Sequence, residues 1–202
     1  MVTTPGAGRL VTCPVIAIVS SAGGLAATGT VLAELPPGLA AAVLVLQHLS
    51  PDHESRLPEV LGTYTKLPVA AARDGQALAP GRVAVAVAAH HLLVTGDRRL
   101  ALVPSGPIPP CRPSADLLLA TLAAVAGPDT IAVVLSGTGT DGSTGAAAVH
   151  RLGGTVITTD AATSIYFGMP QACIVRGETV DHVVALGRVA SLLRELVLQR
   201  VP

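Results

Sequence analysis

VIAIVSSAGGL, residues 15–25, is the stretch that decides the fold of this chain. Five β-prone apolar residues lead into Ser20 and Ser21, a Gly-Gly pair follows, and the sequence then becomes rich in Ala and Leu. This order predicts a buried strand that turns tightly into a helix. In open α/β sheets, ligands bind in the crevice at the carboxyl ends of such strands. The stretch alone leaves two interpretations open for its serines, a nucleophile or a helix N-cap.

Strand, glycine turn and helix recur along the chain. The apolar runs at 41–47 and 131–135 do not alternate with polar residues, which is typical of parallel strands covered on both faces. We therefore expect an α/β fold, a doubly wound and mostly parallel sheet with helices on both faces. Other strands are expected at 69–72, 83–87 and 156–159, and helices at 25–35, 114–126, 143–152, 170–174 and 186–198, with Pro58 in the first turn of a short helix or in a break before one.

The apolar runs are shorter between residues 69 and 103. Those at 92–95 and 100–103 flank Gly96-Asp97, which predicts an antiparallel hairpin inserted in the mostly parallel sheet. The proline-rich segment 104–113 is expected to be an extended surface loop. Residues 1–12 show no periodicity and are expected to form a flexible leader, so that residues 13–202 make one domain.

Composition argues against several classes of protein. Half of the residues are hydrophobic, 13% are charged and the formal net charge is zero, so we expect neither a disordered chain nor a basic surface for nucleic acid. No apolar run reaches the roughly 18 residues of a membrane helix, and no signal peptide is recognisable. The three cysteines form no C-x-x-C pair, which is typical of reduced thiols in the cytoplasm.

Polar residues with complementary chemistry follow three separate strands. They are Ser21, His48 and, in a glycine-rich loop, Asp141. The carboxyl ends of parallel strands lie along one edge of a sheet, so these residues can meet. Acyl transfer needs a hydroxyl, an imidazole that takes its proton and a carboxylate that orients the imidazole. The turn at Gly23 and Gly24 would begin a helix whose N–H groups can stabilise an oxyanion.

Each of these residues also has a structural interpretation. Ser20 or Ser21 can cap a helix, His48 can be a hydrogen-bonded structural residue, and Asp141 can cap the helix that begins near residue 143. Ser114 is expected to cap its own helix, with Asp116 favoured in the first turn by the helix dipole. Adjacent histidines on a strand point to opposite faces, so no metal site is expected at His90-His91. The single histidines are expected on the surface or in packing roles: His53, His150 and His182.

A second motif overlaps the glycine loop. Gly137, Gly139 and Gly142 form G-x-G-x-x-G after a strand, and Asp160 lies where a ribose-binding acid belongs, as in dinucleotide-binding proteins. However, Asp141 would bring a negative charge beside the pyrophosphate, and the unit lies late in the chain. This interpretation also leaves the serine and histidine at the other strand ends unexplained, so we expect no cofactor.

The order of motifs resembles one family over about residues 15–198. VSSAGG is similar to G-A-S-T-G-G, LVLQHLSP to I-x-x-Q-H-M-P, and ARDGQALAPGRVAVA to E-D-G-x-x-L-x-P-G-x-x-Y-I-A. RPSADLLL, LSGTGTDGSTG and SIYFGMPQAC are similar to R-P-S-V-D-x-L, L-T-G-M-G-x-D-G and S-x-x-x-G-M-P. These are motifs of the catalytic domain of bacterial chemotaxis receptor methylesterases, the protein-glutamate methylesterases.

The resemblance implies a site and a reaction. Ser21 would be the nucleophile, His48 the general base and acid, and Asp141 the residue that orients the imidazole. The reaction would be hydrolysis of a glutamyl methyl ester on receptor signalling helices through an acyl-enzyme, with deamidation of glutamine as a further activity and with no cofactor or metal. The resemblance implies an oxyanion and active-site loop formed by Ala22, Gly23, Gly24 and Thr138.

The chain also departs from the family. Family members usually carry a receiver domain before the esterase domain, whereas about a dozen residues precede the first strand here. We therefore expect no receiver domain, and access to the site that is either constitutive or controlled by a separate protein. An alternative is a catalytically weak relative that acts as a receptor-binding or signalling module. The departures lie at the rim of the expected site, at Val19, Ala22, Ser50, Val87, Ala88 and Cys111.

Overall fold

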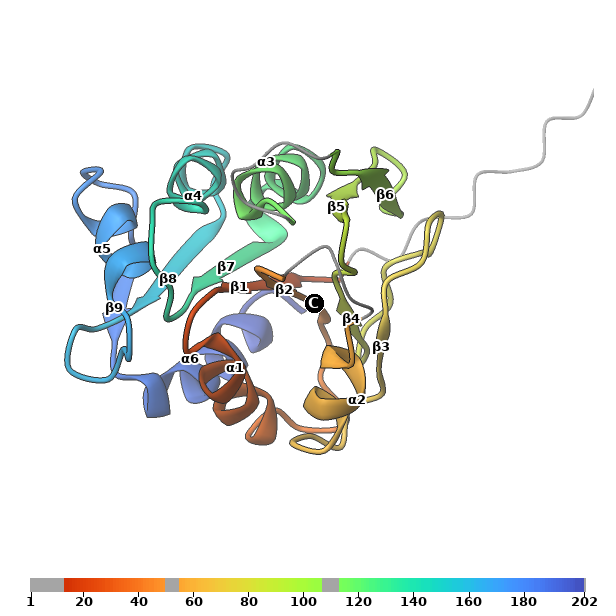
Figure 1. Cartoon of the computed structure of the whole chain (residues 1–202), viewed down its shortest axis with the longest axis horizontal. Helices are drawn as coiled ribbons and strands as arrows, with labels where there is room; N and C mark the ends of the chain where they lie inside the picture. The colour runs from red at the N-terminus through yellow and green to blue at the C-terminus, as the bar shows by residue number, and fades with distance from the viewer. Residues whose placement is uncertain (1–12, 50–54, 107–112, 202) are drawn as a thin grey trace, which may run out of the picture.

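The computed structural model describes residues 13–49, 55–106 and 113–201. The expected leader at 1–12 lies outside the described residues, as do Ser50, Cys111 and most of the proline-rich segment. In the described ranges the chain folds into a central sheet with helices on both sides (Figure 1).

Seven strands form the central sheet in the order β3-β4-β2-β1-β7-β8-β9. The first strand, β1 (Val15–Ser20), lies in the middle between β2 (Ala42–Gln47) and β7 (Thr130–Val134), and all pairings in the sheet are parallel. The α/β, doubly wound prediction is therefore confirmed. The outer strands are β3 (Val69–Ala71), β4 (Val83–Val85), β8 (Thr155–Thr159) and β9 (His182–Val184).

Successive residues of β1 belong to two different hydrophobic cores, because strand side chains alternate between faces. Val15, Ala17 and Val19 pack with α3 (Ala115–Ala126), α4 (Ser143–Arg151) and α5 (Gly168–Ile174). Ile16 and Ile18 pack with α1 (Gly24–Ala33), α2 (Leu57–Gly62) and α6 (Leu186–Leu198). These two groups of helices lie on opposite sides of the sheet in Figure 1. No helix within the described ranges has the length and apolarity needed to cross a membrane.

The short strands between residues 69 and 104 divide between two sheets. β5 (His90–Val94) and β6 (Leu100–Pro104) form the predicted antiparallel hairpin, but as a separate two-stranded sheet that packs against α3. β3 and β4 instead join the central sheet as parallel strands. Pro58 lies in the first turn of α2, as one of the two expectations had it. β9 was not predicted, because three residues carry too little periodicity to be recognised.

Candidate active site

The ends of three neighbouring strands bring Ser21, His48 and the glycine loop together. β1 ends at Ser20, and the next N–H, that of Ser21, donates to the carbonyl oxygen of Ser136 at 2.9 Å. The His48 N–H donates to the carbonyl oxygen of Ser20 at 3.1 Å. Ser21 and His48 line one open pocket together with Gln47 and Tyr64. Within the described residues Ser21 Oγ makes no hydrogen bond to His48, and such contacts commonly tighten only when substrate binds.

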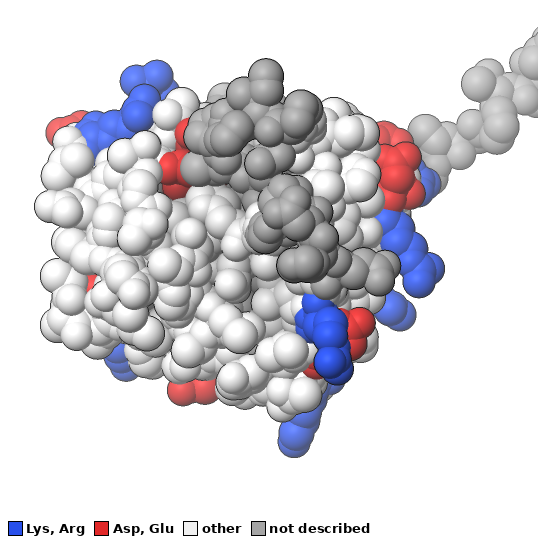
Figure 2. All heavy atoms as spheres, in the orientation of Figure 1, with Lys and Arg blue, Asp and Glu red and all other residues white. Residues whose placement is uncertain are grey.

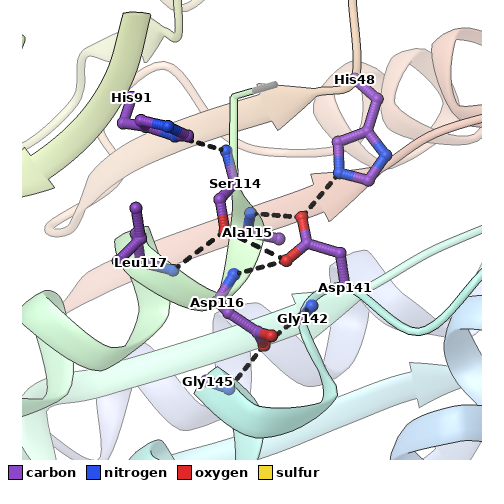
Figure 3. A network of polar contacts seen from close by, with 9 residues as sticks. All are labelled: His48, His91, Ser114, Ala115, Asp116, Leu117, Asp141, Gly142 and Gly145. Carbon is purple, nitrogen blue, oxygen red and sulfur yellow. Dashed lines mark hydrogen bonds and ion pairs between the residues drawn. The ribbon is translucent and has the colours of Figure 1, made fainter. Parts of the chain in front are cut away.

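His48 and Asp141 form a direct pair (Figure 3). His48 Nε2 lies 2.8 Å from Asp141 Oδ2, and the two side chains are 16% and 8% exposed. A carboxylate accepts, so Nε2 is assigned the proton and Nδ1 is left as the basic nitrogen of the neutral ring. The pair can therefore present an oriented base to a hydroxyl in the same pocket.

The carboxylate of Asp141 also lies at the N-terminus of α3. It accepts hydrogen bonds from the N–H groups of Ala115 at 2.7 Å and Asp116 at 3.1 Å, and from Ser114 Oγ at 3.1 Å (Figure 3). These N–H groups have no partner inside the helix. Burial raises the pKa of Asp141, but the hydrogen bonds from His48 and from the Ala115 and Asp116 N–H groups outweigh it and lower the pKa below its ordinary value. The group is therefore an anion at neutral pH.

The structural interpretation of Asp141 as the cap of the following helix, α4, is wrong. The N-cap of α4 is Gly142, at φ 98°, and it has no side chain to offer. Asp116 supplies the missing acceptor, since its Oδ1 accepts from the N–H groups of Gly142 at 2.9 Å and Gly145 at 2.7 Å. Sequence reasoning expected a dipole role for Asp116 and missed this contact. Its place in the RPSADLLL motif was the available signal.

The turn after Ser21 is shaped by two glycines. Gly23 is the N-cap of α1 at φ 73°, without a side-chain cap, so neither serine caps this helix. A Cβ on Gly24 would collide with Ser20 Oγ, and the Gly24 N–H donates to the Ser21 carbonyl oxygen at 2.9 Å. Ser20 is fully buried whereas Ser21 is half-buried and faces the pocket. Of the two serines, Ser21 is therefore the one that a substrate can reach.

The glycine loop packs directly against Ser21. A Cβ on Gly137 would lie 2.9 Å from Ser21 Cβ, so only glycine allows this approach. The Gly137 N–H donates to the Tyr166 carbonyl oxygen at 3.0 Å, and the Met169 N–H donates to that of Gly137 at 2.9 Å. The SIYFGMP segment therefore supports the loop that carries Thr138 and Asp141.

The residues of the alternative sites have other partners. Asp160, which would bind ribose in the dinucleotide alternative, accepts hydrogen bonds from the N–H and Oγ1 of Thr163 at 2.9 and 2.6 Å. His90 Nδ1 lies 3.0 Å from the Ala88 carbonyl oxygen, and His91 Nδ1 accepts from the Ser114 N–H at 3.1 Å. In the described part of the chain no cluster of His, Cys, Asp and Glu could hold a metal ion. His91 is thus a second supporting residue that sequence reasoning missed.

The pocket beside Ser21 is lined without formal charge. Among the described residues its lining contains no Lys, Arg, Asp or Glu. His48 and Tyr64 are the lining residues with an ionisable side chain. On the face shown in Figure 2, acidic and basic side chains gather toward the edge of the molecule and leave wide uncharged areas. Such a pocket suits an uncharged acyl group better than a carboxylate.

Comparisons with known proteins agree on one family. The model of the family described as CheB methylesterase matches residues 16–193. The chain is 37% identical over 179 residues to protein-glutamate methylesterase/protein-glutamine glutaminase 4 of Myxococcus xanthus, covering 89% of this chain and 50% of that protein. It is 34% identical to protein-glutamate methylesterase FrzG of Myxococcus xanthus, covering 91% of this chain and 55% of that protein. The chain thus spans about half the length of these curated relatives.

A solved structure gives the same result for the fold. The crystal structure of the Thermotoga maritima CheB methylesterase catalytic domain superimposes with a TM-score of 0.86 at 34% sequence identity. The match covers 92% of this chain and 100% of that one.

Proposed function

The chain belongs to the CheB methylesterase family, and we propose that it is a serine hydrolase that removes methyl esters from glutamate side chains of chemoreceptor-like proteins. The observation that carries this proposal is the His48–Asp141 pair at 2.8 Å, which lies at the same strand edge as Ser21. The relatives named as protein-glutamate methylesterases support the substrate class. A methyl ester is uncharged, which agrees with a pocket lining that contains no Lys, Arg, Asp or Glu among the described residues.

In this proposal each residue of the triad has one task. Ser21 Oγ attacks the ester carbonyl carbon while His48 Nδ1 takes the hydroxyl proton, because Nε2 is engaged with Asp141. The carbon–oxygen bond to the methoxy group breaks, and the proton passes from His48 to the leaving methanol. Water then attacks the acyl-enzyme with His48 again as the base, which releases the glutamate side chain and restores Ser21.

The loop around Ser21 would stabilise the oxyanion. The Gly24 N–H is engaged with Ser21 and shapes the turn. The N–H groups of Ala22, Gly23 and Thr138 have no acceptor among the described residues, so they are the available donors for the developing negative charge.

The same chemistry extends to a neutral amide. Glutamine deamidation differs in its leaving group, ammonia in place of methanol, and it uses the same base and oxyanion donors. We therefore propose a glutaminase activity as well, in agreement with the names of the relatives. The partner in both reactions would be the signalling helices of a chemoreceptor-like protein in the cytoplasm.

Release of labelled methanol tests this function. Membranes that contain a chemoreceptor labelled with tritiated methyl groups by a receptor methyltransferase are incubated with wild type, Ser21→Ala and His48→Ala. We expect both variants to lose about 10³-fold or more in rate, as members of a triad act together.

Ser20→Ala is the matched control, because Ser20 Oγ is buried and has no partner within the described residues. It should release methanol at a rate close to wild type. Equal rates for wild type and Ser21→Ala would exclude the hydrolase and leave the receptor-binding module as the better hypothesis.

A further inference from the structure

Two aspartates at the starts of the facing helices α3 and α4 each accept hydrogen bonds from the N-terminus of the other helix. Asp116 belongs to the first turn of α3, and its Oδ1 accepts from the N–H groups of Gly142 and Gly145 at the start of α4. Asp141 immediately precedes Gly142, and its carboxylate accepts from the N–H groups of Ala115 and Asp116 at the start of α3. We call this arrangement the crossed capping pair of Asp116 and Asp141 (Figure 3).

Hydrogen bonds link the two halves of the crossed capping pair to each other. The Asp116 N–H donates to Asp141 Oδ1, and the Asp116 carboxylate holds the N–H of Gly142, which is part of the peptide that follows Asp141. Neither aspartate can therefore move without breaking a hydrogen bond to the other's chain segment. The same Asp141 carboxylate also contacts the imidazole ring of His48, with 2.8 Å between Oδ2 and Nε2. The position of His48 thus depends on the position of this pair.

A close approach of the two helices makes the exchange possible. A Cβ added to Gly145 would lie 2.6 Å from Leu119 Cβ and 2.9 Å from the carbonyl oxygen of Asp116. Glycine at this position lets the start of α4 come within reach of the Asp116 carboxylate. Gly142, the N-cap of α4 at φ 98°, donates its N–H to Asp116 Oδ1 at 2.9 Å. The sequence therefore places glycine at both positions that Asp116 holds.

We infer that Asp116 is a positioning residue of the active site, which fixes the Asp141 backbone and through it the orientation of His48. This inference rests on the proposed function, because it assigns Asp116 a task in that reaction. Asp116 does not line the pocket of Ser21, so it acts on the catalytic step and not on binding of substrate. Displacements of about 1 Å in such networks can cost on the order of 100-fold in rate.

Four variants separate geometry from charge. Asp116→Asn keeps the Oδ1 acceptor and loses the charge, and we expect kcat to stay within about threefold of wild type. Asp116→Glu keeps the charge but displaces the acceptor, and Asp116→Ala removes it. For both we expect kcat of methanol release to fall by about 10-fold to 100-fold with KM within about twofold. Asp181→Ala is the control, because it also removes a carboxylate that accepts a backbone N–H, that of Val156 at 2.7 Å, at the opposite end of the sheet.

A double-mutant cycle shows whether Asp116 acts through Asp141. In the Asp141→Ala background, Asp116→Ala should cause no further loss of kcat, whereas losses that multiply would overturn the inference. An unchanged kcat in Asp116→Ala, or an Asp116→Asn variant as slow as Asp116→Glu, would overturn it as well. If Asp116→Ala does not fold, the comparison of Asp116→Asn with Asp116→Glu decides the same question.

A spectroscopic readout keeps this inference separate from the proposed function. The proton NMR resonance of the hydrogen-bonded His48 Nε2–H should persist in wild type and Asp116→Asn and should broaden or disappear in Asp116→Glu. If wild type releases no methanol while the resonance follows this pattern, the proposed function fails and the positioning role stands. If wild type is active and the resonance is the same in all variants, the positioning role is wrong.

Discussion

Asp141 performs two tasks with one charge. Its carboxylate orients His48 and also satisfies the N–H groups at the start of α3. Helix N-termini favour negative charge because the dipoles of the peptide units add up along the axis. Functional residues are often held at a cost to stability, but here the anion that the proposed triad requires also accepts hydrogen bonds that stabilise the fold. The two tasks can be separated by measuring stability and activity of the same variant.

The charge of Asp141 should appear in the pH dependence of stability. Its pKa is lowered in the folded protein from the ordinary value of 3.8, so its ionised form stabilises the fold above that pH, and this contribution is lost as the pH falls through the folded-state pKa. Asp141→Asn should be less stable than wild type by about 1 kcal/mol at pH 7, and the difference should shrink as the pH falls below 3.8 and through the folded-state pKa. Urea unfolding at a series of pH values measures it, and a difference that stays constant would contradict the prediction.

The strand-end positions of the proposed triad were easier to predict than the residues that hold His48 and Asp141 in place. Ser21, His48 and Asp141 each follow an apolar run, and parallel topology places such ends along one edge. Asp116 and His91 act through contacts between α3 and other elements, at sequence separations of 26 and 23 residues. Nothing in the local pattern around an aspartate in a first turn distinguishes a cap of its own helix from a cap of a neighbouring one. That distinction needs the packing of α3 on α4.

At the scale of elements, the α3–α4 contact sets the geometry of the site. Gly145→Ala places a methyl group 2.6 Å from Leu119 Cβ and 2.9 Å from a backbone oxygen, so the helices must separate. We expect a loss of about 1–3 kcal/mol in the free energy of unfolding. Gly38→Ala is the matched control, because a Cβ there meets nothing within 4 Å, and it should be neutral or slightly stabilising. Thermal unfolding of both variants tests this, and equal melting temperatures would show that the contact is not tight.

The elements that were predicted correctly from the sequence have either a long continuous apolar run or a clear helical periodicity of apolar residues. β1, β2, β7 and the helix α6 were predicted to within a few residues, because burial on both faces or on one helical stripe leaves a clear pattern. The division of the short strands could not be predicted. β3 and β5 are both short, with three and five residues, and what decides the sheet that each joins is whether its partner strand is β4 or β6.

At the scale of the whole molecule, the two hydrophobic cores share one set of strands. Alternate residues of β1 belong to opposite cores, and the same strand pairs with β2 and β7 in the middle of the sheet. Neither layer of helices can leave without exposing a face of the strands that hold the other layer. We therefore expect residues 13–201 to unfold in one cooperative transition, with a calorimetric enthalpy equal to the van't Hoff enthalpy. Two resolved transitions in differential scanning calorimetry would show that the layers are energetically independent, and that the carboxyl edge with Ser21 can open while part of the sheet remains folded.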